Sequence, residues 1–333
     1  MNFKPLPLLL LTALAWAEPS AEQKVFGTPP AAKGQPSKPS AKAADNTFGQ
    51  QSQNQAKQAK MMYDRFVSGD MSYAGKLKDA ANAGNRWASL QYGVLAQKGK
   101  LPGLKGPDYA LAQRAYLKAV KNTDGSLTGN YLAAYNLGVL YYNGAGGKKD
   151  PASALRWFQT AITAYRELRK SKTAVLWPAS AYAAQILTRG AGVKADKTAA
   201  RTYWLEAVKG GEPSTLYAFG LTVYSENPFT AIGYFRRAAD RLYVPAMVAQ
   251  ARWYANSDKF HDADPVQAAS WLLRAAHYDK SQAQSAASVM ARLNVQSQKK
   301  AQQSAVQWLK SKGLKPQQFD FTQPLNEEPS VIR

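Results

Sequence analysis

From residue 61 to residue 312, apolar and small residues recur at helical spacing, while most glycines and prolines fall between the periodic segments. Five times, an Asp or Asn is followed four residues later by Ala, seven or eight residues later by an aromatic residue, and eleven residues later by a second Ala. Such offsets lie on one face of a helix with about 3.6 residues per turn. The pattern predicts five helices, which begin after Asp108, Asp150, Asp196, Asn227 and Asp264.

The residues at these helix starts are also good caps. Asp and Asn side chains accept hydrogen bonds from the free N–H groups of a helix's first turn. Pro151, Pro228 and Pro265 follow three of the caps directly, at the first helical position, where the missing N–H of proline costs nothing. Alanines on one face let a neighbouring helix approach closely, and the aromatic residue between them fills the groove. We therefore interpret the five segments as second helices of helical hairpins.

A first helix is predicted upstream of each second helix, and each first helix has a small residue at an equivalent position. The predicted ranges are 85–98, 128–143, 178–189, 213–224 and 244–255, and the small residues are Gly93, Gly138, Ala184, Gly220 and Ala251. A sixth, degenerate hairpin is predicted over 282–293 and 298–312. The predicted fold class is all-α: a right-handed α-solenoid of about six helix-turn-helix hairpins over residues 61–312.

The two ends of the chain lack this periodicity. Residues 1–17 read as a signal peptide, with Lys4, an apolar run from Leu6 to Leu14, and a small-residue cleavage site that ends at Ala17. The apolar run is too short to span a bilayer, and a retained anchor is the alternative. Residues 18–60 are rich in Pro, Ala, Lys, Gln and Ser, which predicts a disordered linker. Residues 313–333 contain three prolines and are predicted to form an irregular tail.

One hairpin carries a more specific pattern. Residues 133–144 read Ala-Ala-Tyr-Asn-Leu-Gly-Val-Leu-Tyr-Tyr-Asn-Gly, and residues 150–157 read Asp-Pro-Ala-Ser-Ala-Leu-Arg-Trp. This stretch closely resembles a Sel-one-like repeat, a relative of the tetratricopeptide repeats, and residues 190–204 are similar to the loop and second helix of the same repeat. The resemblance covers residues 80–312. It implies an adaptor that binds protein or, in bacterial envelopes, takes part in exopolysaccharide export and secretion assemblies.

Net charge and cysteine content limit the classes of partner and site that the sequence allows. The chain has 43 Lys and Arg against 22 Asp and Glu, a formal net charge of +21, which favours acidic partners. It has no cysteine, so disulfides and thiolate metal sites are excluded. Export makes nucleic acid an unsuitable partner and leaves envelope proteins with acidic segments, or an anionic polysaccharide. We expect a periplasmic or secreted protein that does not span the membrane.

Catalytic signals are sparse. The two histidines, His261 and His277, have no cluster of partner ligands in the sequence, and Asp264 beside the first of them is explained as a helix cap. The sequence has no Gly-x-Ser-x-Gly motif and no phosphate-binding loop that ends in Lys-Ser or Lys-Thr. We therefore predict that the protein is not an enzyme and that it has no cofactor, metal or catalytic residue.

The predicted function is an exported scaffold that binds another envelope protein. First helices line the concave face of tetratricopeptide-like solenoids, and this resemblance implies a Tyr- and Arg-rich surface that grips an acidic extended segment. The candidate partner-binding residues are Tyr135, Tyr142, Gln185, Arg189, Tyr217, Tyr224, Arg252 and Asn256. The alternative is an accessory protein that binds an anionic glycan in polysaccharide export or cell-wall processes. Glycan binding predicts an affinity that falls steeply with salt, whereas protein binding predicts an apolar patch that is less sensitive to salt.

Overall fold

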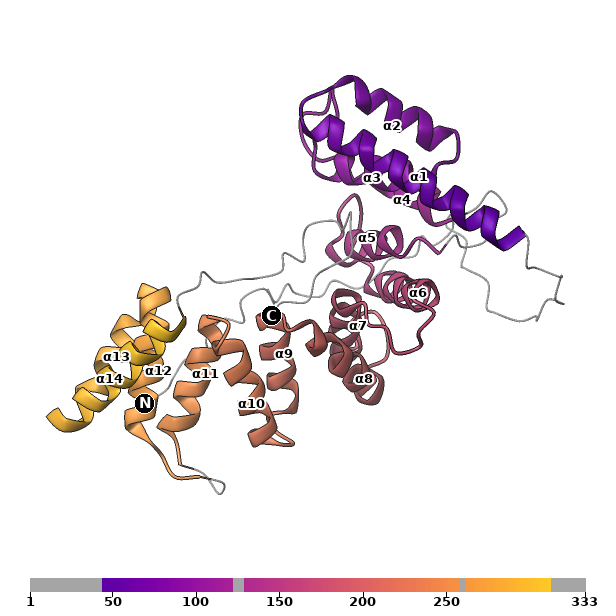
Figure 1. The fold of residues 1–333 in the computed structure, drawn as a ribbon. Coiled ribbons are helices and arrows are strands. Elements are labelled where there is room, and N and C mark those ends of the chain that lie inside the picture. The colour runs from indigo at the N-terminus through magenta and orange to yellow at the C-terminus, as the bar shows by residue number, and fades with distance from the viewer. Residues whose placement is uncertain (1–43, 122–128, 258–260, 313–333) are drawn as a thin grey trace. The chain divides into compact units, whose positions relative to one another are not determined.

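The computed structural model describes residues 44–121, 129–257 and 261–312, and the regular elements in these ranges are all helical (Figure 1). A compact unit from Thr47 to Arg333 contains the repeats. The α-helices are α1 (Ala44–Val67), α2 (Ser72–Asn82), α3 (Arg86–Gln97), α4 (Tyr109–Val120), α5 (Tyr131–Asn143), α6 (Pro151–Leu168), α7 (Trp177–Arg189), α8 (Lys197–Ala207), α9 (Pro213–Val223), α10 (Pro228–Ala239), α11 (Val244–Ala255), α12 (Pro265–Tyr278), α13 (Ala283–Met290) and α14 (Val295–Lys312). Two short 3₁₀ helices, η1 (Val208–Gly210) and η2 (Lys280–Gln282), follow α8 and α12.

The five predicted second helices are confirmed as α4, α6, α8, α10 and α12. Each begins directly after its predicted cap, whose side chain accepts a hydrogen bond from the helix's first turn. At α6, for example, Asp150 accepts from the Ser153 backbone N–H at 2.9 Å. The first helices α5 and α7 end at Gly144 and Gly190, which adopt left-handed backbone conformations at φ 70° and 67°. Glycine allows this helix ending without a Cβ clash, so the chain can turn into the second helix.

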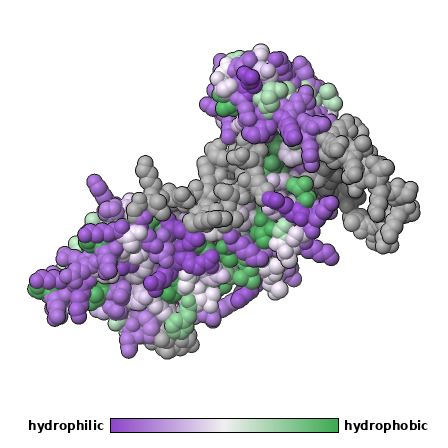
Figure 2. Space-filling model, viewed as in Figure 1, coloured by the Kyte–Doolittle hydropathy of each residue, from purple (hydrophilic) through white to green (hydrophobic). Residues whose placement is uncertain are grey.

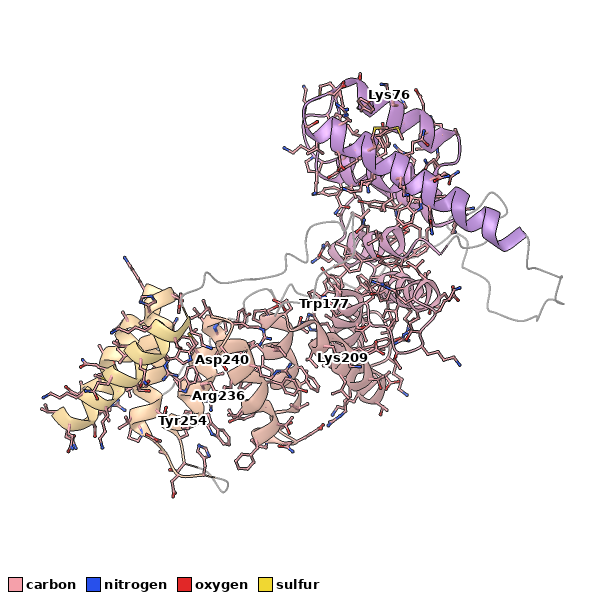
Figure 3. The ribbon with its side chains drawn as sticks, in the orientation of Figure 1. Lys76, Trp177, Lys209, Arg236, Asp240 and Tyr254 are labelled. Atoms are coloured by element: carbon pink, nitrogen blue, oxygen red, sulfur yellow. The ribbon has the colours of Figure 1, made fainter. Side chains whose placement is uncertain are left out.

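Successive helices pack as antiparallel hairpins that stack on their neighbours. The two helices of a hairpin contact each other in the pairs α3–α4, α5–α6, α7–α8, α9–α10 and α11–α12. Contacts between α4 and α5, α6 and α7, and α10 and α11 join one hairpin to the next. Between α8 and α9 the connection includes η1, where Trp177 of α7 lies against Gly210. Figure 3 labels Trp177 and Lys209, the residue before Gly210. This arrangement is an all-α solenoid; its predicted right-handedness stays a prediction.

Three glycines on first helices let an aromatic side chain of the second helix reach the backbone. A methyl group at Gly138 of α5 would lie 2.6 Å from the ring of Phe158 of α6. Gly93 has the same relation to Tyr116 at 2.6 Å, and Gly220 to Phe235 at 2.5 Å. Each of these rings is buried. The small residues and the aromatic residues of the repeat are therefore the two sides of one packing contact, as the spacing predicts.

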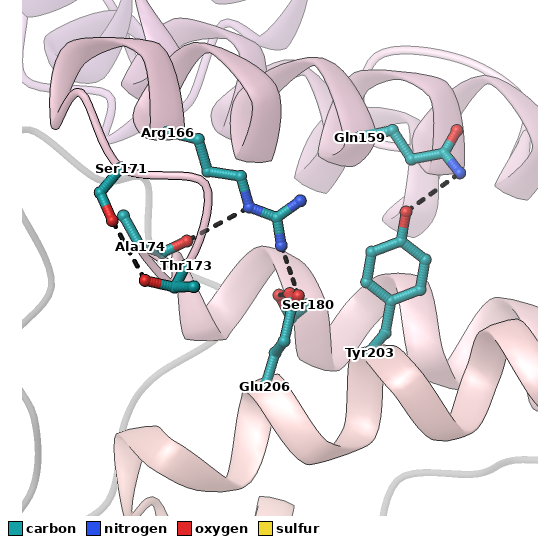
Figure 4. A network of polar contacts seen from close by, with 8 residues as sticks. All are labelled: Gln159, Arg166, Ser171, Thr173, Ala174, Ser180, Tyr203 and Glu206. Atoms are coloured by element: carbon teal, nitrogen blue, oxygen red, sulfur yellow. Dashed lines mark hydrogen bonds and ion pairs between the residues drawn. The ribbon is translucent and has the colours of Figure 1, made fainter.

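A part-buried polar network fastens the hairpin of α7 and α8 to the helix before it (Figure 4). Arg166 of α6 donates to the Ala174 backbone carbonyl at 3.3 Å and forms an ion pair with Glu206 of α8. The second carboxylate oxygen of Glu206 accepts a hydrogen bond from Ser180 of α7 at 2.9 Å. One carboxylate thus joins three helices, which gives Arg166 a packing role.

The beginning of the repeat region differs from the sequence prediction. Residues 44–60, which we expected to belong to the linker, are helical, because α1 begins at Ala44. Its residues Ala59, Met62 and Phe66 are buried, and the Asn85 side-chain amide donates to the Gln55 carbonyl at 3.2 Å. The predicted signal peptide (1–17), the rest of the linker (18–43) and the tail (313–333) lie outside the described residues.

Candidate functional site

The candidate residues come from α5, α7, α9 and α11, and we call their solvent-accessible side the first-helix face. Arg189, Tyr224, Arg252 and Asn256 are exposed on it, while Tyr142, Gln185 and Tyr217 are half-buried. The expectation that Tyr135 is exposed is wrong, because its side chain is completely buried. Its ring packs against Phe158 and Tyr182, with centroids 5.7 and 6.2 Å away. Tyr135 is therefore a core residue and cannot touch a partner.

A first polar cluster joins the ends of α5 and α7. The Tyr142 hydroxyl donates to the Gln185 side-chain oxygen at 3.2 Å, and its ring packs edge-on against Tyr182 at 4.8 Å. Burial raises the pKa of the Tyr142 hydroxyl above its usual value, while the charge and the hydrogen bond of Arg189 oppose that shift. Arg189 thus lies beside the hydroxyl, and the structure brings together three of the predicted residues. The cluster therefore combines an exposed arginine with a half-buried tyrosine.

A second cluster repeats this chemistry on α9 and α11. Burial raises the pKa of the Tyr217 hydroxyl, and the charge of Arg252 opposes that shift. The Tyr217 ring packs against Phe235 at 5.3 Å and Tyr243 at 5.5 Å, which holds it in place. Again a tyrosine of one first helix is combined with an exposed arginine of the next. Asn256 ends α11, where its side-chain amide donates to the Arg252 carbonyl at 2.7 Å.

The first helices contribute no negative charge to this face. The five helices α3, α5, α7, α9 and α11 contain no Asp or Glu, whereas they contain Arg86, Arg189 and Arg252. The acidic residues lie instead at helix caps and on other elements, for example Asp150 and Glu206. The field along the first-helix face is therefore positive, which suits an acidic ligand.

An apolar patch lies at the end of α9 and the start of α10; the sequence analysis named Tyr224 in it but missed Leu221 and Phe229. Leu221, Tyr224 and Phe229 are 45%, 40% and 59% exposed. Phe229 and Tyr224 both contact Trp253 of α11 edge-on, with centroids 5.8 and 6.2 Å away. A signal was present, because Phe229 follows Pro228 at a helix start, two residues before the buried stripe begins at Ala231. Figure 2 shows that hydrophobic residues on the visible side occupy small areas within a mostly hydrophilic surface.

The histidines have packing contacts. The His261 ring stacks on Trp253 with centroids 3.8 Å apart, and its Nε2 lies 2.8 Å from the Trp253 carbonyl oxygen. His277 lies in the last turn of α12 and packs edge-on against Tyr278 at 4.9 Å. Among the described residues, no group of three His, Cys, Asp or Glu side chains is placed to hold a metal ion.

The repeats can now be compared with known proteins. Four segments, residues 132–164, 178–212, 214–241 and 245–277, match the Sel1 repeat model. Residues 132–277 therefore carry Sel1-like repeats. The four matched segments coincide with the hairpins α5–α6, α7–α8, α9–α10 and α11–α12. The hairpin α3–α4 lies before the first match and keeps the same cap and the same glycine contact.

Two solved structures are similar to the chain. A Sel1 repeat protein from Oxalobacter formigenes is 22% identical, with a TM-score of 0.45, and the match covers 72% of this chain and 59% of that one. A protective antigen of uropathogenic Escherichia coli strains, which displays an SLR fold, is 17% identical, with a TM-score of 0.43, and the match covers 77% and 61%. The chain thus spans about three fifths of the length of each. No curated protein matches it.

Within the residues that the structure describes, no helix combines the length and apolar character that crossing a bilayer requires.

Proposed function

We propose that this repeat scaffold binds an envelope protein through the first-helix face and grips an acidic, extended segment of that partner. The observation that carries the proposal is the repeated combination of a tyrosine on one first helix with an exposed arginine on the next: Tyr142 with Arg189, and Tyr217 with Arg252. Sel1 repeats are helical scaffolds of a kind typically used for protein–protein interaction. Export to the periplasm, which follows from the predicted signal peptide, belongs to this proposal.

The chemistry of the two clusters supports an acidic ligand. Arginine offers a planar fork of donors that fits a carboxylate in two-point contact, and tyrosine adds a rigid apolar ring with a polar tip. Both tyrosines are held by aromatic neighbours, so little side-chain entropy is lost on binding. The exposed Leu221, Tyr224 and Phe229 lie on the same hairpin as Tyr217 and offer an apolar anchor beside the charges. Such a combination favours a peptide with both acidic and apolar side chains.

A crosslinked pull-down of the protein from envelope extract, at low and high salt, tests the proposal. The first variant combines Arg189→Ala, Tyr224→Ala and Arg252→Ala, whose side chains are exposed on the first-helix face. The matched control combines Tyr109→Ala, Arg114→Ala and Arg292→Ala, which are exposed elsewhere. We expect one protein partner that survives high salt, at least about 30-fold weaker capture by the first variant, and unchanged capture by the control.

Equal capture by wild type and both variants would refute the role of the first-helix face. Recovery of polysaccharide alone, released by salt, would instead favour the alternative function as an anionic-glycan-binding accessory protein. Circular dichroism of each variant checks that the helices are intact. Because all six positions are exposed, their replacement should leave the fold unchanged.

A further inference from the structure

A second positive surface lies where the first helix of each hairpin turns into the second. The turns after α3, α5 and α7, together with the first residue of α8, carry six exposed lysines, two on each hairpin, and we call them the turn lysines; Lys98, which also follows α3, is half-buried and does not belong to the set. The turn lysines are Lys100, Lys105, Lys148, Lys149, Lys194 and Lys197. The residues of the first-helix face that the proposed function uses are separate from these six. Their arrangement therefore needs its own explanation.

Successive turns lie against one another, so the lysines belong to one continuous edge. A methyl group at Gly146, in the turn after α5, would lie 3.0 Å from Tyr109 Cβ at the start of α4. A methyl group at Gly192, in the turn after α7, would lie 3.3 Å from the Ala152 nitrogen at the start of α6. Each turn thus rests on the helix start of the hairpin before it. Glycine is required at both positions, since φ is +84° and +67°.

The charges of this edge are not neutralised by nearby carboxylates. The acidic residues within these three turns are the caps Asp108, Asp150 and Asp196. Each cap carboxylate accepts a backbone N–H of its own helix, at 2.8, 2.9 and 2.9 Å. None of the turn lysines forms an ion pair with a carboxylate of the described residues. The basic edge ends at the next hairpin, where Glu226 in the turn after α9 pairs with Arg201 of α8 at 3.2 Å.

We propose that the turn lysines dock the protein onto an anionic lipid surface. They lie on the ends of three adjacent hairpins, and such a rim can approach a broad flat surface at several turns at once. All six are lysines, compact hydrated charges that need no fixed contact geometry, whereas arginine is the residue for two-point recognition of a single group. Lipid headgroups attract basic side chains in this long-range manner, by about fivefold in affinity for each lysine near the surface.

Flotation of the full chain with lipid vesicles tests this proposal. The probe is a vesicle with one part phosphatidylglycerol to two parts phosphatidylcholine, compared with phosphatidylcholine alone. The test variant combines Lys105→Gln, Lys149→Gln and Lys194→Gln, one change on each turn. The control combines Lys209→Gln, Lys299→Gln and Lys310→Gln, which are exposed elsewhere and reduce the net charge equally. All three proteins keep the same N-terminal segment, so any insertion of that segment is common to them.

We expect binding to the anionic vesicles that weakens above about 0.15 M salt. The test variant should bind about 100-fold more weakly, from about fivefold for each of three lysines, and the control should bind like wild type. Equal loss in both variants would overturn the proposal, because net charge alone would then explain binding. Failure of wild type to bind anionic vesicles while it binds polyglutamate would also overturn it and would assign the edge to an acidic polymer. Neither result depends on capture of a protein partner by the first-helix face.

Discussion

The contact between Gly138 and Phe158 predicts that Gly138→Ala does not give the gain in stability that this substitution usually gives inside a helix. Replacing a glycine inside a helix by alanine normally stabilises the protein by about 0.8–1 kcal/mol. At Gly138, however, the new methyl group would lie 2.6, 2.7 and 2.9 Å from three ring atoms of Phe158. The ring cannot move away easily, because it is completely buried and stacks on Tyr182 at 4.6 Å with an interplanar angle of 3°.

Gly233 supplies a matched control in the same fold. It lies inside α10, is exposed, and has nothing within 4 Å of the position of a new methyl group. The gain in helix propensity is common to Gly138→Ala and Gly233→Ala, so it cancels when the two variants are compared. The difference that remains is the overpacking of a core, about 1–3 kcal/mol. We expect Gly233→Ala to be more stable than wild type and Gly138→Ala to be less stable than Gly233→Ala by that amount.

Urea unfolding followed by circular dichroism measures both variants, and the midpoints convert to free energies through the slope of the transition. Phe158→Leu, alone and combined with Gly138→Ala, identifies the contact, because a smaller side chain should accept the methyl group and give a favourable coupling in the double-mutant cycle. If Gly138→Ala and Gly233→Ala were equally stable, or if the cycle showed no coupling, the packing explanation would be refuted.

Three further perturbations test other contacts of the fold. Glu206→Ala should lower the free energy of unfolding by about 1–3 kcal/mol, because it leaves the part-buried Arg166 without its carboxylate partner. Glu226→Ala removes an exposed ion pair and should change the free energy of unfolding by less than about 1 kcal/mol in the same urea titration. Asp150→Ala should cost about 1 kcal/mol and Asp150→Asn much less, since both Asp and Asn cap helices. Burial alone would raise the pKa of Asp150, but hydrogen bonds from Ser153 and the charge of Arg156 hold this pKa below its usual value. The carboxylate therefore stabilises the fold above about pH 4, and this stabilisation is lost as the pH falls through the lowered pKa. In Asp150→Asn, the free energy of unfolding should fall less steeply as the pH is lowered. Arg274 lies 4.2 Å over Trp271 and 5.2 Å over Trp308, and it donates a hydrogen bond to Ser304 at 2.9 Å. Arg274→Ala should therefore lower the free energy of local opening of α14 by about 2 kcal/mol. Hydrogen exchange should become faster in α14 and stay unchanged in α5.

The helix starts were predictable because the N-cap residue and the helical spacing of the apolar residues are both local features of the sequence. Asp150 with Pro151, and Asn227 with Pro228, fix a helix start by hydrogen bonding and backbone geometry within one turn, and the structure begins α6 and α10 there. The start of the helical region was not predicted correctly, although Ala59, Met62 and Phe66 follow helical spacing. Their signal is surrounded by Gln and Lys, whose abundance favoured a linker, and burial against later helices decides the outcome.

Exposure on the first-helix face was harder to predict, because it depends on the neighbouring hairpin. Tyr135 and Tyr217 both lie three residues before the glycine of their helix, yet one is buried and the other half-exposed. Phe158 and Tyr182 pack around Tyr135, whereas the Tyr217 ring packs against Phe235 and Tyr243 and stays half-exposed. The repeat pattern specifies the shared position, but the side chain that the next repeat places opposite it specifies whether a partner can reach it.

The distribution of charge connects the two proposed surfaces to the construction of the repeat. A short acceptor is favoured at an N-cap, and four of the five hairpins place an Asp before their second helix, where a backbone N–H of that helix donates to the carboxylate. The other charged residues of the turns after α3, α5 and α7 and of the first helices are lysine and arginine. Positive charge therefore lies on the first-helix face and on the turn lysines, where it can attract acidic ligands. On the first-helix face, exposed arginines accompany tyrosines whose rings are held by aromatic neighbours, whereas the turn lysines are exposed and form no ion pair within the described residues. The first-helix face therefore offers a contact of defined geometry, whereas the turn lysines offer a non-specific attraction. Salt should weaken the attraction of the turn lysines far more than the contact made by the first-helix face.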